Sequence, residues 1–492
     1  MSYVYFFVRL PQVISAYKEG PMVKQTFVSK LAIILVMILI IGWRILAKHT
    51  YITTIDEVVA LFPKTVEDIT QREKHAQEEA RHLVQQIIAL DHEKRTFDNT
   101  LKALDRAGSC VGREGSMFNA ITHTHPDASL RTVAADAINH LSDFSVEVFS
   151  QNIALYKAIK VYAEGNGKSE QLSPEQQYYL DETLRGFVRN GIDKSPEDQA
   201  KITTIKKELS KLEQDFERQI SSDGRHILVS EPELKGLTSE FISALKKDVD
   251  GAYILGVDYP TYVTVMEHCS VESTREKLWR SFVSRACPEN ITTLTSIIKL
   301  RDELAHLLGY ENYAHYDIED EMAQTPHNVT RFLDDLVART GQKVILEIER
   351  YMQELPEGIT LVDGKIKPWD ISYIKAVYRK KQFDFDDRLI AEYFPLEHTL
   401  EQLLNLYELF LGVTFEMVPG TFYHPEVKGI KVTTPAGKLL GFLLLDLHPR
   451  PDKFTHACFM PLVPSLVLPD AQLQPGVGLV VANFSRSTAE HL

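Results

Sequence analysis

The histidines of this sequence are its first candidates for metal chemistry. On a helix, the pattern H-E-x-x-H supplies two metal ligands one turn apart, with a general base between them. None of the 17 histidines begins such a pattern. His92-Glu93 is the single His-Glu pair, and Thr96 stands where the second histidine would be needed. The sequence therefore assigns no catalytic, cofactor-binding or metal residue.

A second candidate is a set of ligand-type side chains at three- and four-residue steps, namely His75, Glu78, Glu79 and His82. This spacing places them on one face of a helix, from which they could hold a metal ion. A site on a single exposed helix lacks a closed coordination shell and the outer hydrogen bonds that orient ligands. A solvated charged face is therefore the favoured interpretation.

His123 and His125 form a third candidate. Both lie in Thr122–Asp127, where Pro126 and the threonines indicate a turn and the entry to a new helix. A structural role is favoured over a metal site.

Composition indicates an acidic globular protein. Among 492 residues there are 68 Asp and Glu against 54 Lys and Arg, which gives a net charge of −14. This balance argues against nucleic acid as a partner, because phosphate binding draws on clustered Lys and Arg. An acidic surface could attract basic peptides. The sequence also lacks a G-x-S-x-G nucleophile elbow and a P-loop.

The four cysteines lie far apart and include no C-x-x-C pair; they are Cys110, Cys269, Cys287 and Cys458. This pattern favours unpaired buried thiols over a disulfide framework or a cysteine zinc site. If the body is exported, one pair could still be oxidised.

Leu31–Trp43 is an uncharged apolar run. A spanning helix needs roughly twenty apolar residues, and extending the run to Ala47 must include Arg44. An uncleaved membrane anchor is favoured over a cleaved signal peptide followed by export, because no small-x-small pair follows the run. A buried helix is the third interpretation. Basic residues on both sides leave the orientation open, and Met22 could be the true start.

The rest of the chain is predicted to be mainly α-helical. Apolar residues recur at helical spacing from Asp56 to Asp105, which indicates one or two long helices, and Gly108–Gly115 is predicted to break the helical pattern. Glu233–Val249 is predicted as a further helix and Tyr262–Val265 as a short strand. Leu396–Leu411 is predicted as an apolar helix that ends at Gly412.

After Gly412 the apolar period changes to that of strands. Short β-rich runs separated by Pro and Gly predict a small sheet near the C-terminus. These runs are Val413–Val418, Lys428–Thr433, Leu439–Leu447, Phe454–Pro461 and Val477–Asn483.

Several rare combinations of aromatic, proline and acidic residues follow one another in the C-terminal half. They are Pro368-Trp369-Asp370, Phe383-Asp384-Phe385-Asp386-Asp387, Glu392-Tyr393-Phe394-Pro395, Tyr423-His424-Pro425-Glu426-Val427, Leu445-Asp446-Leu447-His448-Pro449-Arg450 and Val481-Ala482-Asn483-Phe484. In this order they resemble the thimet oligopeptidase, neurolysin and oligopeptidase A family of zinc peptidases. The likeness covers roughly Thr65 to Leu492.

The resemblance implies a multi-helical, two-lobed body with a deep channel that admits short unstructured peptides. It also implies zinc as the cofactor, endopeptidase activity, and a monomer when the fold is complete. We expect an N-terminal segment at residues 1–50, a helical domain at residues 51–264 and an incomplete catalytic domain at residues 265–492.

In this family the matching segment leads into a helix that carries H-E-x-x-H, and the residues that anchor the substrate lie further downstream. The chain as given is therefore predicted to hold no zinc and to be inactive, and whether Leu492 is a natural terminus stays open. The alternative is a noncatalytic, membrane-tethered peptide-binding or scaffold protein.

Four polar residues lie closest in sequence to the expected zinc helix: His424, Asp446, Arg450 and His456. For Asp446 and Arg450, a pair that supports the sheet is favoured over a catalytic role.

The sheet would pack against the zinc helix in the complete fold. We therefore expect one sheet face of this chain to be exposed as an apolar patch, with unpaired strand edges beside it. The residues expected on this face are Phe442, Leu444, Phe459 and Val480.

Overall fold

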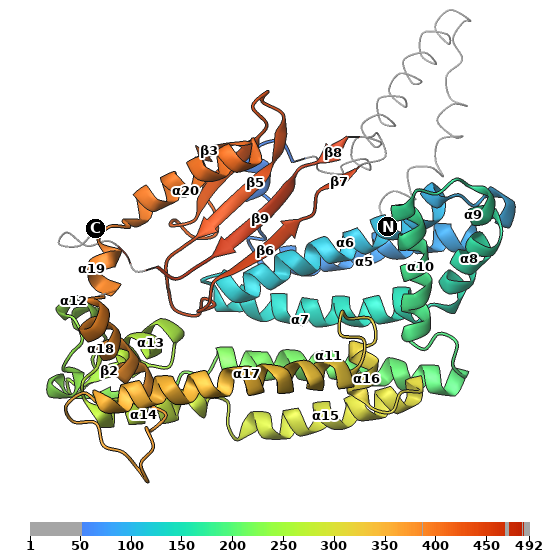
Figure 1. Ribbon diagram of the computed structural model, residues 1–492. Helices are drawn as coiled ribbons and strands as arrows, with labels where there is room; N and C mark the ends of the chain where they lie inside the picture. The colour runs from blue at the N-terminus through green and yellow to red at the C-terminus, as the bar shows by residue number, and fades with distance from the viewer. Residues whose placement is uncertain (1–51, 386, 468–471, 485, 487–492) are drawn as a thin grey trace, which may run out of the picture. The chain divides into compact units, whose positions relative to one another are not determined.

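The computed structural model describes residues 52–385, 387–467, 472–484 and 486. The chain divides into two units, residues 1–53 and 54–492, and the helices and strands labelled in Figure 1 belong to the second unit. The predicted membrane segment Leu31–Trp43 lies outside the described residues. Within the described ranges, no helix is both long enough and apolar enough to cross a membrane.

Three long consecutive helices pack against one another at the start of this unit, after the short α4 (Ile55–Val59). They are α5 (Val66–Ala89), α6 (Phe97–Thr124) and α7 (Ala128–Ser145), with the single turn η1 (His92–Lys94) between the first two. Capping boxes at Thr65 and Thr96 satisfy free backbone N–H groups where α5 and α6 begin. Leu101 and Phe118 are fully buried in the shared core.

A second group of helices follows a π-helical turn, η2 (Val146–Ser150). These helices are α8 (Ile153–Glu164), α9 (Asn166–Ser169), α10 (Pro174–Arg189), α11 (Pro196–Ser221), α15 (Glu289–Leu308) and α16 (Tyr313–Ile318). The helices α11 and α15 pack together through a core that includes Ile202, Leu209 and Ile297. The apolar side of α11 therefore forms part of the core.

A small region between α11 and α15 surrounds an antiparallel strand pair. Its elements are β1 (His226–Val229), η3 (Glu231–Leu234), α12 (Ser239–Ala244), β2 (Tyr253–Gly256), α13 (Tyr259–His268) and α14 (Glu272–Val283). The predicted strand at Tyr262–Val265 is wrong, because these residues lie in α13. Asp258 caps that helix, and Pro260 occupies its first turn. The helix predicted over Glu233–Val249 is reduced mainly to α12.

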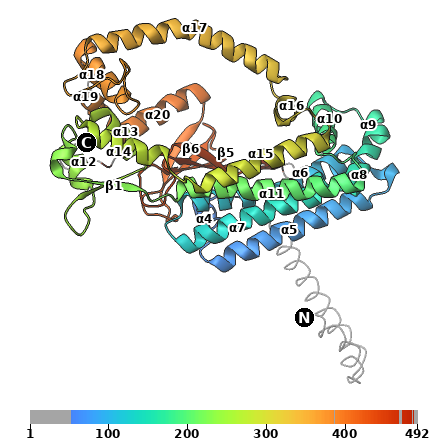
Figure 2. The same cartoon turned by 90° about the horizontal axis from the view of Figure 1, so that it is seen from below.

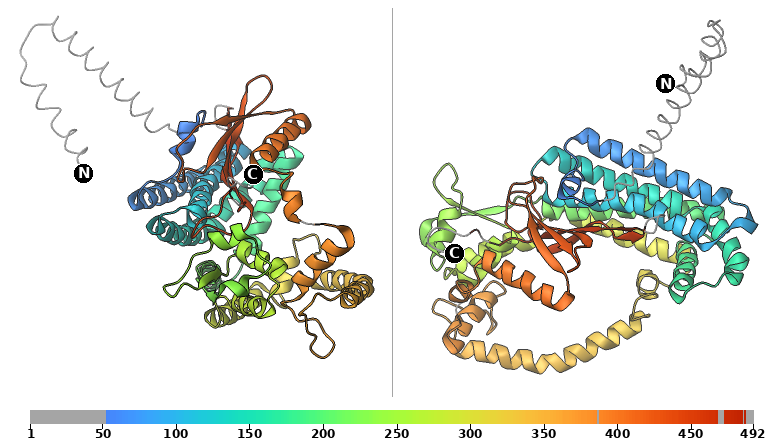
Figure 3. Two further views of the ribbon diagram at one scale, coloured as in Figure 1. Left: turned by 90° about the vertical axis from the view of Figure 1, so that its left-hand side faces the viewer. Right: turned by 90° about the horizontal axis from the view of Figure 1, so that it is seen from above.

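The C-terminal helices are α17 (Pro326–Gln353), α18 (Ile371–Phe383), α19 (Asp387–Ala391) and α20 (Leu396–Leu411). No residue of α17 is buried. Its closest helical neighbours are α16 and α18, which adjoin its two ends, and Figures 2 and 3 show its middle running apart from α11 and α15. The α20 prediction is confirmed, and Gly412 ends the helix in the left-handed conformation with φ 65°.

The predicted C-terminal sheet is present and has five strands in the order β3-β4-β5-β9-β6. The strands are β3 (Thr414–Val418), β4 (Lys428–Thr433), β5 (Leu439–Asp446), β6 (Cys458–Val463) and β9 (Gly476–Val481). The β5–β9 pair is parallel and the others are antiparallel. A two-stranded ribbon of β7 (Leu466–Val467) and β8 (Leu473–Gln474) lies between β6 and β9 in the sequence. Together with the many helices of the chain, this small sheet confirms the predicted mainly α-helical fold class.

The prediction of an exposed apolar patch on this sheet is mostly wrong. One face packs against α20, where Val480 contacts the cluster around Ile430 and Leu445. Phe442 and Leu444 point to the opposite face, since side chains alternate along a strand, and both are buried. Of the predicted residues, Phe459 is exposed. The sheet is therefore covered on both faces by elements of this chain.

The predicted break at Gly108–Gly115 is also wrong, because α6 continues through it to Thr124. Each helical glycine costs roughly 1 kcal/mol relative to alanine. The buried residues Ala107, Val111 and Phe118 on both sides of these glycines return at helical spacing, and their packing outweighs that local cost.

Candidate functional site

The histidine candidates of the N-terminal helices do not come together. On α5, His75 lies 3.8 Å from Glu79 across an exposed turn, and His82 contacts Gln86 at 2.9 Å. His92 lies in the single turn η1, and Thr96 caps α6, so this stretch is a helix junction. Throughout the described ranges, no group of three or more His, Cys, Asp or Glu residues is placed to hold a metal ion.

The histidines near the turn after α6 are involved in packing. The His123 ring meets Phe454 edge-on with centroids 5.6 Å apart, and the His125 ring lies 6.1 Å from Tyr423. Burial lowers the pKa of His125. The predicted turn and helix entry is confirmed, because α7 begins after Asp127, whose carboxylate accepts the backbone N–H of Ser129.

Asp446, at the end of β5, is the centre of a buried polar cluster. Its carboxylate accepts two hydrogen bonds from Arg450, at 2.7 and 2.6 Å, so the predicted pair is present and bidentate. The Tyr423 hydroxyl donates to it at 2.7 Å, and the Lys453 ammonium lies 2.8 Å away. Arg450 also donates to the backbone carbonyl of Thr124 at the end of α6. The cluster therefore ties the sheet to the N-terminal helices.

Burial and charge act in opposite directions within this cluster. Burial favours the protonated carboxyl of Asp446, but hydrogen bonds from Arg450, Lys453 and Tyr423 outweigh it and lower the pKa. Burial raises the pKa of Tyr423, and the charge of Asp446 adds to that effect. The Lys453 pKa is lowered because burial outweighs its contact with Asp446. These buried groups therefore stabilise the fold. They do not form a solvent-exposed acid–base pair that could act on a substrate.

Sequence reasoning missed Lys453. Its side chain is 0% exposed, and its ammonium donates to three backbone carbonyls, those of Asp446, His448 and Ala482. A lysine in a Pro- and Asp-rich turn has the sequence context of a solvent-exposed residue, so no local signal marks it. The three carbonyl groups come together around the ammonium only because β9 pairs with β5 in the folded sheet.

The remaining polar candidates near the sheet also lie apart. The His424 ring nitrogen is 3.7 Å from Glu426, and burial, aided by the Arg450 charge, lowers its pKa. His456 packs its ring against Tyr259 with centroids 4.6 Å apart. The structure gives neither residue a catalytic partner among the described side chains.

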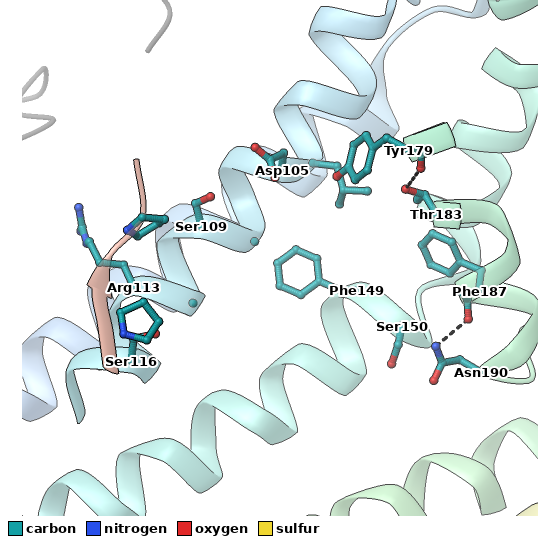
Figure 4. A pocket seen from close by; sticks show the side chains of 16 residues that line it. Asp105, Ser109, Arg113, Ser116, Phe149, Ser150, Tyr179, Thr183, Phe187 and Asn190 are labelled. Carbon is teal, nitrogen blue, oxygen red and sulfur yellow. Dashed lines mark hydrogen bonds between the residues drawn. The ribbon is translucent and has the colours of Figure 1, made fainter. Parts of the chain in front are cut away.

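A cavity of about 550 Å³ is the best candidate for a binding site (Figure 4). It lies between α6, η2, α10 and the end of β6. Its volume falls within the usual range of pockets for small ligands. The α6 wall carries small residues, Gly108, Ser109, Gly112 and Ser116, and the opposite walls carry the rings of Phe149, Tyr179 and Phe187.

Two local features open this cavity. A Cβ added at Gly108 or Gly112 would meet no atom within 4 Å, so these glycines leave room at the α6 wall. The π-helical turn η2 carries Phe149 and Ser150, which line the cavity as well. The glycines that sequence analysis interpreted as a helix break therefore shape a site within an unbroken helix.

Charged residues lie along the α6 side of the cavity. Asp105 and Arg113 are eight residues apart, which is about 12 Å along a helix, and Arg113 also contacts Glu114 at 3.2 Å. Burial, together with the Asp105 charge, raises the pKa of Tyr179 to about 12. The lining includes hydroxyl groups but no histidine. The cavity is therefore suited to binding and lacks a nucleophile with an adjacent base.

Lys206 lies behind this wall and contacts the side-chain oxygen of the lining residue Asn190. Burial, together with the charge of Arg189, lowers its pKa to about 8. This contact links α11 to the cavity wall at Asn190.

Comparison with known proteins shows what the chain is similar to. Residues 265–492 match the model of peptidase family M3. This region is therefore a peptidase family M3 domain, and the chain is similar to a thimet-like oligopeptidase and to oligopeptidase A. The chain is 29% identical over 449 residues to the thimet-like oligopeptidase of Dictyostelium discoideum, and the match covers 88% of this chain and 66% of the relative.

Two further relatives support the same assignment. Oligopeptidase A of Escherichia coli is 27% identical over 428 residues, covering 83% of this chain and 62% of the relative. Saccharolysin of Saccharomyces cerevisiae is 26% identical over 400 residues, covering 76% of this chain and 56% of the relative. The chain thus spans about two thirds or less of the length of these relatives.

The zinc of M3 peptidases does not fit the described part of this chain. The sequence has no H-E-x-x-H, and the isolated histidines described above offer one nitrogen each where catalytic zinc needs three protein ligands. No chemical step through zinc can be assigned to residues of this chain.

Proposed function

We propose that this chain is the peptide-binding body of a zinc-dependent oligopeptidase, and that the chain as given hydrolyses no peptide. The observation that carries this proposal is the M3 match over residues 265–492, combined with a sequence that contains no H-E-x-x-H. The match supports peptides as ligands, while the missing motif removes two metal ligands and the general base.

The cavity between α6, η2 and α10 is proposed as a contact site for short peptides. Three aromatic rings, from Phe149, Tyr179 and Phe187, provide apolar area for a peptide side chain. Asp105 and Arg113 provide opposite charges along the same wall. Basic peptides are further favoured by the net charge of −14.

Zinc content and hydrolysis test the first part of the proposal. The purified 492-residue chain should hold no stoichiometric zinc after dialysis and should leave a library of quenched fluorescent peptides uncut. Elemental analysis showing one tightly held zinc per chain, together with cleavage that a chelator abolishes, would overturn it.

A cavity-filling substitution tests the second part. Gly112→Leu places a side chain in the open space of the cavity and should weaken the binding of a short fluorescent peptide by about tenfold, since a bulky side chain competes for the same volume. Gly115→Leu adds the same group to α6 at a position that does not line the cavity. Equal binding by both variants would show that the peptide binds elsewhere.

We also propose a membrane location through Leu31–Trp43, supported by its uncharged sequence between Lys30 and Arg44. Exposing large apolar side chains to water is unfavourable by roughly 1.5–3 kcal/mol each. Cell fractionation should find the full chain with membranes and a shortened chain that begins at Thr50 in the supernatant. Recovery of the full chain in the supernatant would refute the anchor, and the exported form then becomes the favoured alternative.

A further inference from the structure

The cavity between α6, η2 and α10 combines three aromatic rings with a carboxylate. The rings belong to Phe149, Tyr179 and Phe187, and the carboxylate belongs to Asp105 on the α6 wall. Figure 4 shows the three rings around one common space. The face of an aromatic ring carries partial negative charge and attracts cations. Rings that stand beside a carboxylate therefore suit an organic cation better than a neutral apolar group.

Each of the three rings packs against a second ring that does not line the cavity. The ring centroids in these pairs are 6.2, 6.4 and 5.5 Å apart; the pairs are Phe149 with Phe144, Tyr179 with Phe97, and Phe187 with Tyr156. This packing restricts the lining rings before any ligand enters. A site that is ordered in advance loses little conformational entropy when it binds.

The cavity rings have no cation of their own among the described residues. Arg81 lies over the ring of Phe144 and Lys160 lies over the ring of Tyr156, at 5.1 and 5.8 Å from the centroids. Both cations thus contact the supporting rings, and within the described ranges no lysine or arginine is placed over a ring that lines the cavity. The lining rings are available to a cation from a ligand.

Asp105 is unpaired in the same sense. Its carboxylate forms no ion pair with any side chain that the structure describes, whereas Asp98 on the same helix pairs with Lys102 at 2.6 Å. Burial, together with the Asp105 charge, raises the pKa of Tyr179 to about 12, so the carboxylate and this hydroxyl group interact. The acidic end of the cavity is therefore formed by Asp105 and Tyr179.

Positive charges lie at the other parts of the cavity. Arg113 lines it about 12 Å from Asp105 along α6, and Lys206 contacts the lining residue Asn190 from behind. Repulsion between like charges disfavours a cationic ligand at both places. A cation is thus directed to the end at Asp105.

We propose that this cavity is a specificity pocket for one lysine or arginine side chain of a bound peptide. The charged group lies between Asp105 and the ring of Tyr179, and the apolar stem of the side chain packs against Phe149, since such side chains bury their stems and keep their charged ends near polar groups. The inference rests on the proposed function and deepens it, because it names the kind of residue that the peptide-contact site selects.

Peptides that differ at one position test the proposal. Three fluorescent peptides of otherwise neutral sequence carry lysine, norleucine or glutamate at the central position. Norleucine keeps the apolar stem of lysine and lacks the ammonium group. In fluorescence anisotropy at low salt, the 492-residue chain should bind the lysine peptide about tenfold more tightly than the norleucine peptide, and the glutamate peptide most weakly.

Substitutions in the pocket should remove this preference. Asp105→Asn and Tyr179→Leu should each reduce the lysine-to-norleucine ratio to about threefold or less, because each removes one of the two groups that contact the cation. Binding of the norleucine peptide should stay within about twofold, which shows that the cavity remains folded. The matched control Asp98→Asn removes the same charge from α6 outside this cavity, and it should leave the ratio unchanged.

Equal affinities for the lysine and norleucine peptides would overturn the proposal, and so would equal effects of Asp105→Asn and Asp98→Asn. If the affinities are equal and Gly112→Leu weakens both peptides, the peptide-contact site stands and only the preference for a cation is refuted.

A blocked amino acid separates the opposite case. If none of the three peptides binds, Nα-acetyl-lysine amide is titrated against the chain by ligand-observed NMR. Binding that Asp105→Asn weakens would support the cation pocket and refute the peptide-contact site alone. No binding of this compound would overturn both.

Discussion

The helices α6 and α17 invite direct comparison, because each has 28 residues and each begins at a threonine cap. In both, the threonine side chain accepts the backbone N–H three residues on, from Asn99 and from Asn328. Yet α6 buries eleven residues and α17 buries none. An amphipathic pattern and a good cap make a helix, but neighbouring elements decide whether its apolar side is buried.

The two helices should therefore differ in the interactions that stabilise them. The α6 helix is stabilised by its core and by a buried contact between Glu114 and Arg72 at 2.6 Å. The α17 helix depends on local pairs such as Arg339 with Asp335 at 2.9 Å, which stabilise a helix by only about 0.2–0.5 kcal/mol each. The free energy of global unfolding should therefore respond to substitutions in α6 and hardly at all to substitutions in α17.

The largest expected effect comes from the buried cluster that holds the end of α6 to the sheet. Asp446→Asn leaves Arg450 and Lys453 without their counter-charge at side-chain exposures of 7% and 0%. The free energy of unfolding should fall by roughly 3–5 kcal/mol, the usual result of breaking a buried ion pair from one side. Urea denaturation measures it.

A matched control is available beside this cluster. Asp452 pairs with Arg131 at 2.9 Å but is 64% exposed, so Asp452→Asn should cost about 0–1 kcal/mol. Similar losses for the two variants would show that the Asp446 cluster is no stronger than a surface pair.

Leucine truncation compares the two helices directly. Leu101 on α6 is 0% exposed and Leu336 on α17 is 46% exposed. Leu101→Ala should lower the free energy of unfolding by about 2–5 kcal/mol, because it removes buried methyl groups and leaves a cavity. Leu336→Ala should change it by less than about 0.5 kcal/mol. A large loss at Leu336 would mean that α17 is packed in solution.

Acid should weaken the same cluster in a defined direction. The pKa of Asp446 is lowered from its usual value of 3.8 by hydrogen bonds that outweigh burial. The unfolded chain therefore takes up the proton first, and the stabilisation is present above about pH 4 and lost as the pH falls through the folded pKa. Stability of the parent chain should drop more steeply below pH 4 than that of Asp446→Asn. Parallel pH profiles would contradict this assignment.

Sequence patterns predicted the elements whose signals are local. The Leu396–Leu411 helix and the Lys428–Thr433 strand were recovered with their bounds, because Gly412 and the alternation of side chains are local features. Tyr262–Val265 was misread because β-branched residues favour strands, whereas the Asp258 cap starts a helix. Lys453 could not be recognised, since its partners come from β5 and β9.

The prediction also placed the exposed apolar surface on the wrong element, namely the sheet, and the reason is physical. The prediction left one face of the sheet exposed, because sequence patterns do not show that α20 and the N-terminal helices cover the sheet. Phe442 and Leu444 are buried as a result, and among the described residues α17 and α20 are the helices that carry many exposed apolar side chains instead. Periodicity identifies apolar stripes, while the choice of which stripes meet depends on the tertiary fold.

The smallest expected effect concerns the two caps. Thr96→Ala removes an N-cap from a helix in the core and should lower the free energy of unfolding by about 1 kcal/mol. Thr325→Ala removes the equivalent bond from α17 and should leave global stability within about 0.5 kcal/mol, while amide exchange in the first turn of α17 accelerates. Equal losses of global stability would mean that α17 unfolds together with α6.

Amide hydrogen exchange of residues 97–124 and 326–353, measured by mass spectrometry, tests the account most directly. For the chain alone, α6 should exchange only through global unfolding and α17 through local opening. Exchange of α17 as slow as that of α6 would contradict the claim that α17 is held by local interactions alone.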